Sequence, residues 1–337
     1  MTLYCGIDLH ANNSVLAILD EHDQVHFEKR LPNDLGILVG ALEPFREALA
    51  GCVVESTYNW YWLVDGLMEA GFRVHLAHTG GIVQYAGLKH TNDESDARHL
   101  AHLLRLGILA EGYIMPKEPR ALRDLLRRRM LLVHQRTLNL LSLQSLITRH
   151  TGERLSANQI KTLDVDTYRD RLPEPIVVGA LVTAQSMRVL DHLIDLLEQD
   201  VHRRLHDQED FRLLTTIPGV GKILGATIAL ETGTIKRFPG PGQYASYARC
   251  TNTQKISNGK TKGRGNKKNG NKYLAWAFME AAHHAAIWSP RIKQFYHKRR
   301  AKRHILVAKK TVANKLARAC YHMLSKQEAF DVTRAFG

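Results

Sequence analysis

Four carboxylates in the first hundred residues have the types and spacing that metal-assisted phosphoryl chemistry uses. Asp8 closes one apolar, strand-like run and Glu55 closes another. If these two strands lie side by side and parallel, both carboxylates project from the same end of the sheet. Asp93 and Asp96 are three residues apart on a predicted helix and therefore share one face. Carboxylate oxygens suit Mg²⁺ or Mn²⁺, and two such ions about 4 Å apart activate a nucleophile and stabilise the leaving oxygen.

Each of the four acids also has a purely structural interpretation. Asp93 and Asp96 could complement the dipole at the start of a helix, and Glu55 could bond to the turn that follows its strand. Asp8 is harder to explain in this way, because Gly6-Ile7-Asp8 lies in an apolar strand where an unpaired charge is costly. As an ordered set, the four acids favour a metal site.

The positive charge of the chain is concentrated in one segment. Between Thr232 and Gln327 there are 22 Lys and Arg residues and a single acid, Glu280, so the whole net charge of +14 originates there. Its densest part, Arg249 to Lys272, mixes Lys and Arg with Gly and Asn and has few apolar residues. This composition predicts either a basic loop that becomes ordered on phosphates or a solvated loop with a purely electrostatic role. The expected phosphate-contacting residues are Lys255, Lys260, Lys262, Arg264, Lys267, Lys268 and Lys272.

A glycine turn precedes the basic segment. The run Ile217-Pro218-Gly219-Val220-Gly221 between two helical stretches is typical of a helix-hairpin-helix. In that motif the turn and the next helix N-terminus offer backbone N–H groups to a phosphate, which makes Gly219, Gly221 and Lys222 candidate nucleic-acid contacts. A nucleotide-binding phosphate loop fits this run poorly, because Ile223 stands where a magnesium-binding hydroxyl is needed. A plain packing corner is the alternative.

The elements that must position the four acids are predicted as follows. Short β-prone runs at 4–8, 15–19 and 25–31 indicate an antiparallel meander. A helix over 34–50, a strand over 51–55, a helix over 60–70 and a strand over 72–77 follow, and another helix reaches about residue 106. This order predicts an α/β domain with a mixed, ribonuclease-H-like sheet over residues 1–115.

The remainder is predicted to be all-α. Residues 116–210 form two long amphipathic helices, the second with an apolar stripe at three- and four-residue spacing, as in a helical hairpin or a dimer seam. Residues 211–337 form a mainly helical basic domain with the glycine turn, the basic loop and a final helix over about 291–325. The four cysteines are far apart, without metal or redox spacing, which indicates a reducing cytoplasm. No membrane partner is expected.

The ordered motifs resemble a known family. Gly6-Ile7-Asp8, Val53-Val54-Glu55, Asp93-x-x-Asp96 and Ile217-Pro218-Gly219-Val220-Gly221, in this order, resemble the transposases of the insertion-sequence family numbered one hundred and ten, relatives of the Piv DNA invertase. The resemblance runs essentially end to end. It implies a RuvC-like domain with an Asp-Glu-Asp-Asp set, a coiled-coil middle and a carboxy-terminal transposase domain.

The resemblance also implies a mechanism. Asp8, Glu55, Asp93 and Asp96 would be the metal-binding acids, and a serine of the carboxy-terminal domain would attack DNA to form a covalent phosphoserine. Alignment on Gly263 and Gly270 assigns that serine to Ser257, with Ser246 and Ser289 as competitors. A non-coding bridge RNA would choose donor and target DNA. The acids and the serine would act together from the same or from different subunits, near the nucleoid of a prokaryote.

Three functions remain open at this stage. The first is an RNA-guided DNA recombinase that acts on two duplexes as a homodimer or homotetramer joined through the long helices. The second is a metal-only, structure-selective nuclease similar to a Holliday-junction resolvase, which needs no serine nucleophile. The third is a nucleic-acid-binding protein without catalysis.

Overall fold

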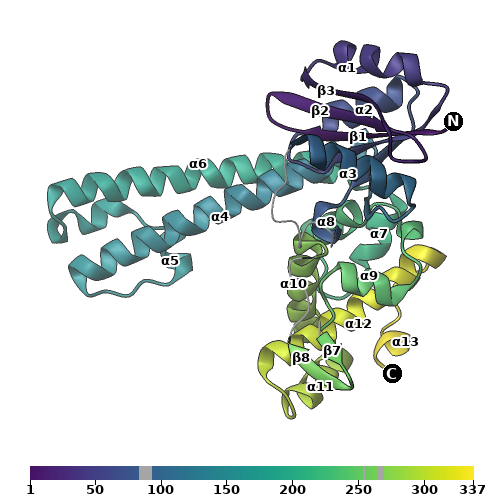
Figure 1. Ribbon diagram of the computed structural model, residues 1–337. Helices are drawn as coiled ribbons and strands as arrows, with labels where there is room; N and C mark the ends of the chain where they lie inside the picture. Colours follow the sequence, from purple (N-terminus) through teal and green to yellow (C-terminus); the bar gives the residue numbers. More distant parts are fainter. Residues whose placement is uncertain (83–92, 253–254, 264–268) are drawn as a thin grey trace. The chain divides into compact units, whose positions relative to one another are not determined.

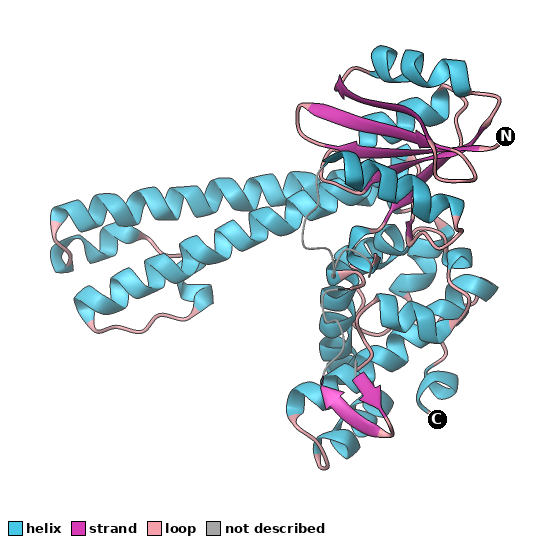
Figure 2. Cartoon of the chain, viewed as in Figure 1, coloured by secondary structure: helices cyan, strands magenta, loops and turns pink. Residues whose placement is uncertain are grey.

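The computed structural model describes residues 1–82, 93–252, 255–263 and 269–337. The chain divides into two compact units, Met1–Ile114 and Met115–Gly337. Each unit has hydrophobic clusters of its own and is described by itself. Figure 2 shows a sheet flanked by helices in the first unit and a mainly helical second unit.

A mixed sheet organises Met1–Ile114 (Figure 1). Its strands run in the order β3-β2-β1-β4-β5-β6. They are β1 (Leu3–Leu9), β2 (Asn13–Leu19), β3 (Val25–Pro32), β4 (Leu49–Glu55), β5 (Val74–Ala77) and β6 (Glu111–Gly112). The first three form the antiparallel meander, whereas β1, β4 and β5 are parallel neighbours. The predicted ribonuclease-H-like α/β fold class is therefore confirmed.

Alternation along β1 assigns its two faces to different helices. Cys5, Ile7 and Leu9 point to one face and join the cluster that holds α1 (Leu35–Leu42) and α2 (Tyr61–Glu69). Gly6 and Asp8 point to the opposite face, which α3 (Asp93–Arg105) covers. The helical region predicted over 34–50 is shorter than expected. Pro44 has no N–H to extend α1, and a 3₁₀ turn (Glu43–Phe45) leads to β4.

Gly6 allows α3 to lie directly on the sheet. A Cβ at Gly6 would be 1.9 Å from the Ala97 carbonyl oxygen and 2.7 Å from the Ala101 backbone nitrogen. Ala97 and Ala101 are fully buried at this contact. Small residues on both surfaces therefore bring the helix backbone close to β1, next to Asp8.

Ion pairs fix the position of α3 along the sheet. Arg98 donates to both carboxylate oxygens of Glu28 on β3, at 2.5 and 2.6 Å. Near the end of the helix, Arg105 bonds in the same bidentate way to Asp23 in the β2–β3 turn. Bidentate pairs restrict both distance and angle, so they set the register of α3 as well as its attachment. A further 3₁₀ turn, Thr79–Gly81, follows β5.

Two long helices begin the second unit. They are α4 (Lys117–Thr151) and α6 (Glu174–Leu205), which pack side by side (Figure 1) and are called the helix pair below. Between them, α5 (Ala157–Lys161) and a 3₁₀ helix (Val165–Arg171) close a small hydrophobic cluster at the tip. The predicted stripe on α6 buries Met187, Ile194 and Val201.

Among the described residues, α6 is the one helix with the length and hydropathy to cross a membrane. The helix nevertheless carries acidic residues that pair with α4. Arg129 contacts Glu198 at 2.6 Å, and Arg136 contacts Asp191 at 2.5 Å. The apolar residues of α6 therefore belong to a helix pair whose two helices are also connected by ion pairs.

The rest of the second unit is a helical domain packed around α10 and α12. Its elements are α7 (Glu209–Thr215), α8 (Lys222–Thr232), a 3₁₀ turn (Ile235–Arg237), α9 (Pro241–Tyr247), β7 (Lys255–Ser257), β8 (Lys260–Gly263), α10 (Lys272–Trp288), α11 (Pro290–Arg300), α12 (Ile305–Lys326) and α13 (Val332–Phe336). Buried alanines on α10 and α12 allow close helix packing. Leu126, Val201 and Leu230 join the helix pair to this domain.

Two local predictions for this domain were wrong. The single helix expected over about 291–325 is two helices, α11 and α12, separated at Ala301–His304. The run Lys298-Arg299-Arg300 places cations in the last turn of α11, where they complement the helix dipole, and His304 caps α12 by accepting from the Leu306 N–H. The basic loop contains a β-hairpin, β7–β8, which is called the basic hairpin below.

Candidate functional site

The first half of the site is the end of two neighbouring strands. Because β1 and β4 are parallel and pair Ile7 with Val54, Asp8 and Glu55 leave the sheet together. Their side chains share a hydrogen bond, which requires a proton on one of them. Burial raises the pKa of Asp8, and burial followed by the bond to Asp8 raises the pKa of Glu55 to about 7. The pair therefore holds a proton at a pH where isolated carboxyls are ionised.

The start of α3 supplies the second half. The Arg30 Nη2 lies 2.6 Å from the Asp93 Oδ2, and this hydrogen bond lowers the pKa of Asp93. Asp96 differs, because burial, followed by the charges of Asp8 and Asp93, raises its pKa. Its Oδ1 is buried and accepts no hydrogen bond within the part of the chain that the structure describes. These four acids, Asp8, Glu55, Asp93 and Asp96, are called the acidic cluster below.

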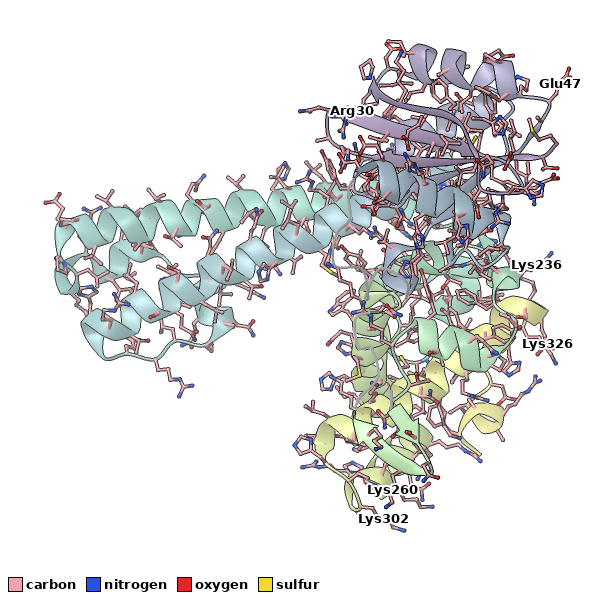
Figure 3. The ribbon with its side chains drawn as sticks, in the orientation of Figure 1. Arg30, Glu47, Lys236, Lys260, Lys302 and Lys326 are labelled. Atoms are coloured by element: carbon pink, nitrogen blue, oxygen red, sulfur yellow. The ribbon has the colours of Figure 1, made fainter. Side chains whose placement is uncertain are left out.

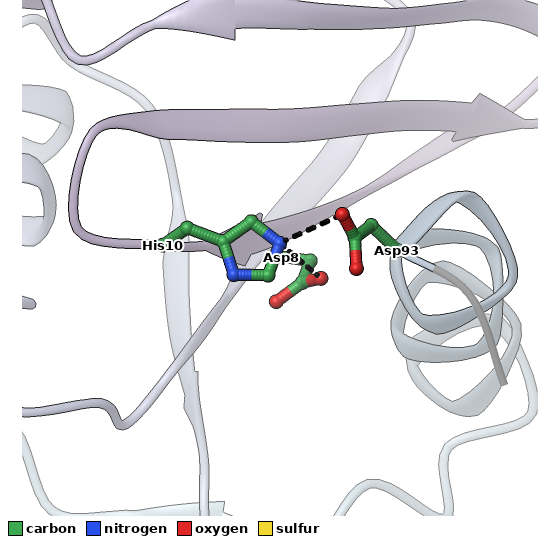
Figure 4. Close-up of side chains that lie close together, drawn as sticks. All are labelled: Asp8, His10 and Asp93. Carbon is green, nitrogen blue, oxygen red and sulfur yellow. Dashed lines mark ion pairs between the residues drawn. The ribbon is translucent and has the colours of Figure 1, made fainter.

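His10 is a member of the site that the sequence reasoning missed. Its Nε2 lies 3.2 Å from the Asp8 Oδ2 and 3.2 Å from the Asp93 Oδ2 (Figure 4). The His10 carbonyl accepts hydrogen bonds from the side chains of Asn33 and Asn59, both at 3.0 Å, which fixes the strand end. The available signal was the Asp-x-His spacing, because His10 directly follows β1 and residues two apart along an extended chain share a face.

Arg30 was missed for a different reason. It is a residue of β3, two strands away from Asp8, and no sequence motif connects the two residues. The sheet register aligns Asp8 with Val15 on β2, and Val15 with Arg30 on β3. All three side chains therefore point to the face that α3 covers, where Arg30 reaches Asp93.

The residues present fit a divalent cation. One ligand atom each from Asp8, His10 and Asp93 lies within 4.8 Å of the other two. Several carboxylates in a partly buried site repel one another unless protons or cations neutralise them. Protonation at Asp8 and Glu55 and the Arg30 contact provide part of that neutralisation. The buried, unbonded oxygen of Asp96 is the strongest single indication of a missing cationic partner.

Ser257 belongs to the other compact unit. It ends β7 and pairs with Lys260 across the basic hairpin. The connecting residues Asn258 and Gly259 have φ of +50° and +70°, the two positive values that a type I′ turn requires. Ser257, Lys260 and Lys262 are all exposed, and Figure 3 shows the Lys260 side chain at the hairpin. A hydroxyl and two cations are thus presented to solvent on one small scaffold.

The glycine turn lies between α7 and α8. Gly219 has φ +81°, and a Cβ there would be 2.6 Å from the backbone of His284 and Ala285 on α10. Gly221 is the N-cap of α8 and offers no capping side chain, and Lys222 follows it on the surface. An open hollow of about 650 Å³ adjoins the turn and includes the exposed Trp288. The arrangement leaves α8 N–H groups accessible to an anion.

The remaining expected phosphate contacts have different positions. Lys255 begins β7, and Lys272 begins α10 with its Nζ 5.1 Å above the Tyr273 ring. Arg264, Lys267 and Lys268 lie outside the described residues.

The competing serines differ from Ser257 in their surroundings. Ser289 is buried, and its hydroxyl accepts from the Ile292 N–H as the cap of α11. Ser246 is an exposed residue of α9, outside the basic hairpin. Of the two competitors, Ser289 is therefore already used in the fold.

Two family models match segments of the chain. Residues 5–151 match the model for the DEDD transposase domain of IS110 elements. Residues 211–297 match the model described as the transposase IS116/IS110/IS902 family. A search of curated proteins finds no match. The first match contains the acidic cluster, and the second contains the glycine turn and the basic hairpin.

Proposed function

We propose that the chain is a transposase of the IS110 family, which cuts and rejoins DNA using divalent cations at the acidic cluster and Ser257 as the nucleophile. Transposases of this kind act on DNA, and a DEDD domain implies the use of a divalent metal. The proposed metal is Mg²⁺, with Mn²⁺ as a substitute, because all four acids offer hard oxygen ligands.

The convergence of Asp8, Glu55, Asp93 and Asp96 at one sheet end carries the proposal. These residues are far apart in the sequence, yet the parallel pairing of β1 with β4 and the close approach at Gly6 bring them together. In the proposed mechanism they hold the metal, which when bound supplies charge stabilisation for phosphoryl transfer. His10, between Asp8 and Asp93, would orient these two carboxylates.

The basic hairpin supports the second part of the proposal. The Ser257 hydroxyl would lose its proton as Oγ forms a bond to the scissile phosphorus, while the bond from phosphorus to one strand's oxygen breaks and that oxygen takes up a proton. Lys260 and Lys262 would bind the phosphate and neutralise the charge that develops on it. The resulting phosphoserine keeps a phosphoester bond that a second DNA hydroxyl can attack, so the strand can be rejoined without another energy source.

The proposed partners are donor and target duplexes, a non-coding bridge RNA and further copies of the chain. The RNA is proposed on the motif resemblance alone. A homodimer or homotetramer is supported by an exposed apolar row on α6, which differs from the stripe that faces α4. The row consists of Val178, Val182, Val189, Leu193 and Leu196. Action at the nucleoid in a prokaryotic cytoplasm follows from the DNA substrate.

A metal-only nuclease is the second candidate function. It is favoured by one observation, that the whole acidic cluster belongs to Met1–Ile114 whereas Ser257 does not. A protein of this kind would cut branched DNA by activating water and would form no covalent intermediate.

Substitution of Ser257 separates the two functions. The experiment incubates wild type, Ser257→Ala and Ser246→Ala with the element's DNA, its flanking RNA and MgCl₂, and then detects protein–DNA adducts on denaturing gels. We expect the adduct and strand exchange to be lost in Ser257→Ala and retained in Ser246→Ala. Wild-type cleavage by Ser257→Ala would support the metal-only nuclease instead, and unchanged recombination by Asp8→Asn would favour a non-catalytic role for the acids.

A further inference from the structure

The two chain segments that enter and leave the basic hairpin are held together. Arg249, in the left-handed region at φ +54°, donates its Nε to the carbonyls of Asn269 and Gly270, both at 3.1 Å. The Asn271 N–H donates to the Tyr247 carbonyl at 2.6 Å. Gly270 is at φ +88°, and a Cβ there would be 2.5 Å from the same carbonyl. This root of the hairpin is therefore a close backbone-to-backbone contact.

Asn271 connects the root to a buried carboxylate. Its side-chain oxygen accepts from the N–H groups of Tyr273 and Leu274 and so caps α10. Its side-chain nitrogen donates to the Glu231 Oε2 on α8 at 2.7 Å. The oxygen and the nitrogen of the Asn271 side-chain amide are therefore both hydrogen-bonded. A shift of Glu231 would move Asn271, and with it either the cap of α10 or the backbone contact at the root.

Glu231 is in turn fixed by the helix pair. Its side chain is 3% exposed, and Arg127 on α4 donates to both of its oxygens, from Nε at 2.7 Å and from Nη2 at 2.8 Å. The Arg127 guanidinium also lies 4.5 Å from the Tyr273 ring centre, at the start of α10. The bidentate hydrogen bonds and the ring contact together hold the Arg127 guanidinium in one orientation.

We propose that Glu231 is a positioning residue for strand transfer, which with Arg127 and Asn271 fixes the root of the basic hairpin to the base of the helix pair. The inference rests on the proposed role of Ser257 as the nucleophile. A buried carboxylate that accepts three hydrogen bonds contributes rigidity, because two of them come from Arg127 on α4 and the third from Asn271 at the start of α10, so α8 is tied to both elements. Subunit contacts made through the helix pair would then be transmitted to the segment that carries Ser257.

The helix pair supplies a matched control. Arg129 is two residues along α4 from Arg127 and pairs with Glu198 on α6, where its Nε at 2.7 Å and its Nη2 at 2.6 Å both contact the same oxygen, Oε1. That pair contacts neither α8 nor α10 among the interactions described above. Arg127→Lys and Arg129→Lys keep a cation beside the carboxylate and remove only the planar guanidinium, so neither leaves a buried charge without a partner.

Two measurements test the proposal on the full chain. The first is amide hydrogen exchange without DNA, followed at residues 249–252 and 269–272. We expect Arg127→Lys and Glu231→Gln to exchange faster there than wild type, and Arg129→Lys to match wild type. The second is the rate of adduct formation at saturating DNA, which should fall at least about tenfold in the first two variants, because small misplacement of a reacting group is costly. DNA affinity should change by less than about twofold.

The outcomes separate this inference from the proposed function. Unchanged exchange at the root in both variants overturns the inference, whether or not Ser257 is the nucleophile. Faster exchange with a wild-type adduct rate, or an equal loss of rate in Arg129→Lys, also overturns it. If the wild type forms no adduct at all, the serine proposal fails, while the exchange comparison still decides whether Glu231 fixes the root.

Discussion

The α-carbon of Gly6 faces the Ala97 carbonyl so closely that a methyl group on Gly6 would lie 1.9 Å from that oxygen. The contact joins the middle of β1 to the first half of α3. Asp8 is two residues beyond Gly6, and Asp96 is the residue before Ala97, so the approach of two backbones places two members of the acidic cluster side by side. The contact links the packing of the sheet directly to the proposed chemistry.

Replacing Gly6 by alanine should therefore damage both stability and activity. The new methyl group meets backbone rather than a flexible side chain, so α3 must move, at a cost of about 1–3 kcal/mol or more. Thermal unfolding and Mg²⁺-dependent DNA cleavage measure the two effects. Gly40→Ala on α1 is the control, because nothing lies within 4 Å of its added Cβ and alanine favours a helix. Equal behaviour of the two variants would contradict the role of the Gly6 contact.

The Asp8–Glu55 pair predicts a pH dependence of the metal-free protein. The pKa of Glu55 is about 7 in the folded chain and lies near 4.5 when the chain is unfolded. Between these values the folded state binds the extra proton, so the free energy of unfolding falls as pH rises from about 4.5 to about 7 and is then level. At 1.36 kcal/mol per unit, this loss is at most about 3 kcal/mol.

Urea denaturation in EDTA at several pH values measures this slope. Glu55→Gln cannot titrate at this position, so it should be more stable than wild type at pH 8 and lose that advantage near pH 5. Glu47→Gln, an exposed carboxyl in the same unit, should keep the wild-type profile. A Glu55→Gln profile parallel to that of wild type would show that the buried pair does not hold the proton.

Asp96 predicts a stability difference that depends on metal. Without a cation its buried carboxylate is disfavoured by burial and by Asp8 and Asp93, so Asp96→Asn in EDTA should be at least as stable as wild type. With MgCl₂ at 100 times its dissociation constant, wild type should gain about 2.7 kcal/mol, and Asp96→Asn should lose most of that gain. Calorimetry of both proteins with and without MgCl₂ measures the stability difference in EDTA and the stabilisation by Mg²⁺.

The control for Asp96→Asn is Glu94→Gln, which removes the same charge from the same helix turn. Glu94→Gln should respond to MgCl₂ as wild type does. If Asp96→Asn keeps the full stabilisation by MgCl₂, Asp96 is not a ligand.

The basic hairpin predicts a change in the salt dependence of DNA binding. If Lys260 and Lys262 each neutralise one phosphate of a duplex, replacing either by alanine should lower the slope of log affinity against log salt by about 0.9. Fluorescence anisotropy titrations of labelled DNA at KCl concentrations from about 50 to about 300 mM measure this slope. Lys161→Ala, on the exposed α5, should leave the slope unchanged. An unaltered slope in the Lys260→Ala, Lys262→Ala double variant would rule out phosphate contact by the hairpin.

Several elements could be predicted because local chemistry decides them. The segments that form β1 to β5 follow from short apolar runs separated by polar turns, whereas the two-residue β6 was not predicted. The parallel pairing of β1 with β4 agrees with the rules for connections between strands. The Asn258-Gly259 turn carried a usable signal as well, since this dipeptide supplies both positive φ values of a hairpin. That signal was obscured by the surrounding lysines, which are typical of a disordered loop.

What the sequence determined by itself is the set of side chains that can do chemistry and the elements that carry them, because hydrophobic periodicity and turn residues act over a few positions. Beyond the Asp8–Glu55 and Asp93–Asp96 pairs, only the tertiary structure decided which side chains meet. Arg30 reaches Asp93 through the register of three strands, and Glu231 reaches Arg127 and Asn271 through the packing of three helices. Such contacts join residues about 40 to 100 positions apart, and they depend on the closure of long loops and on packed faces, which no local pattern encodes.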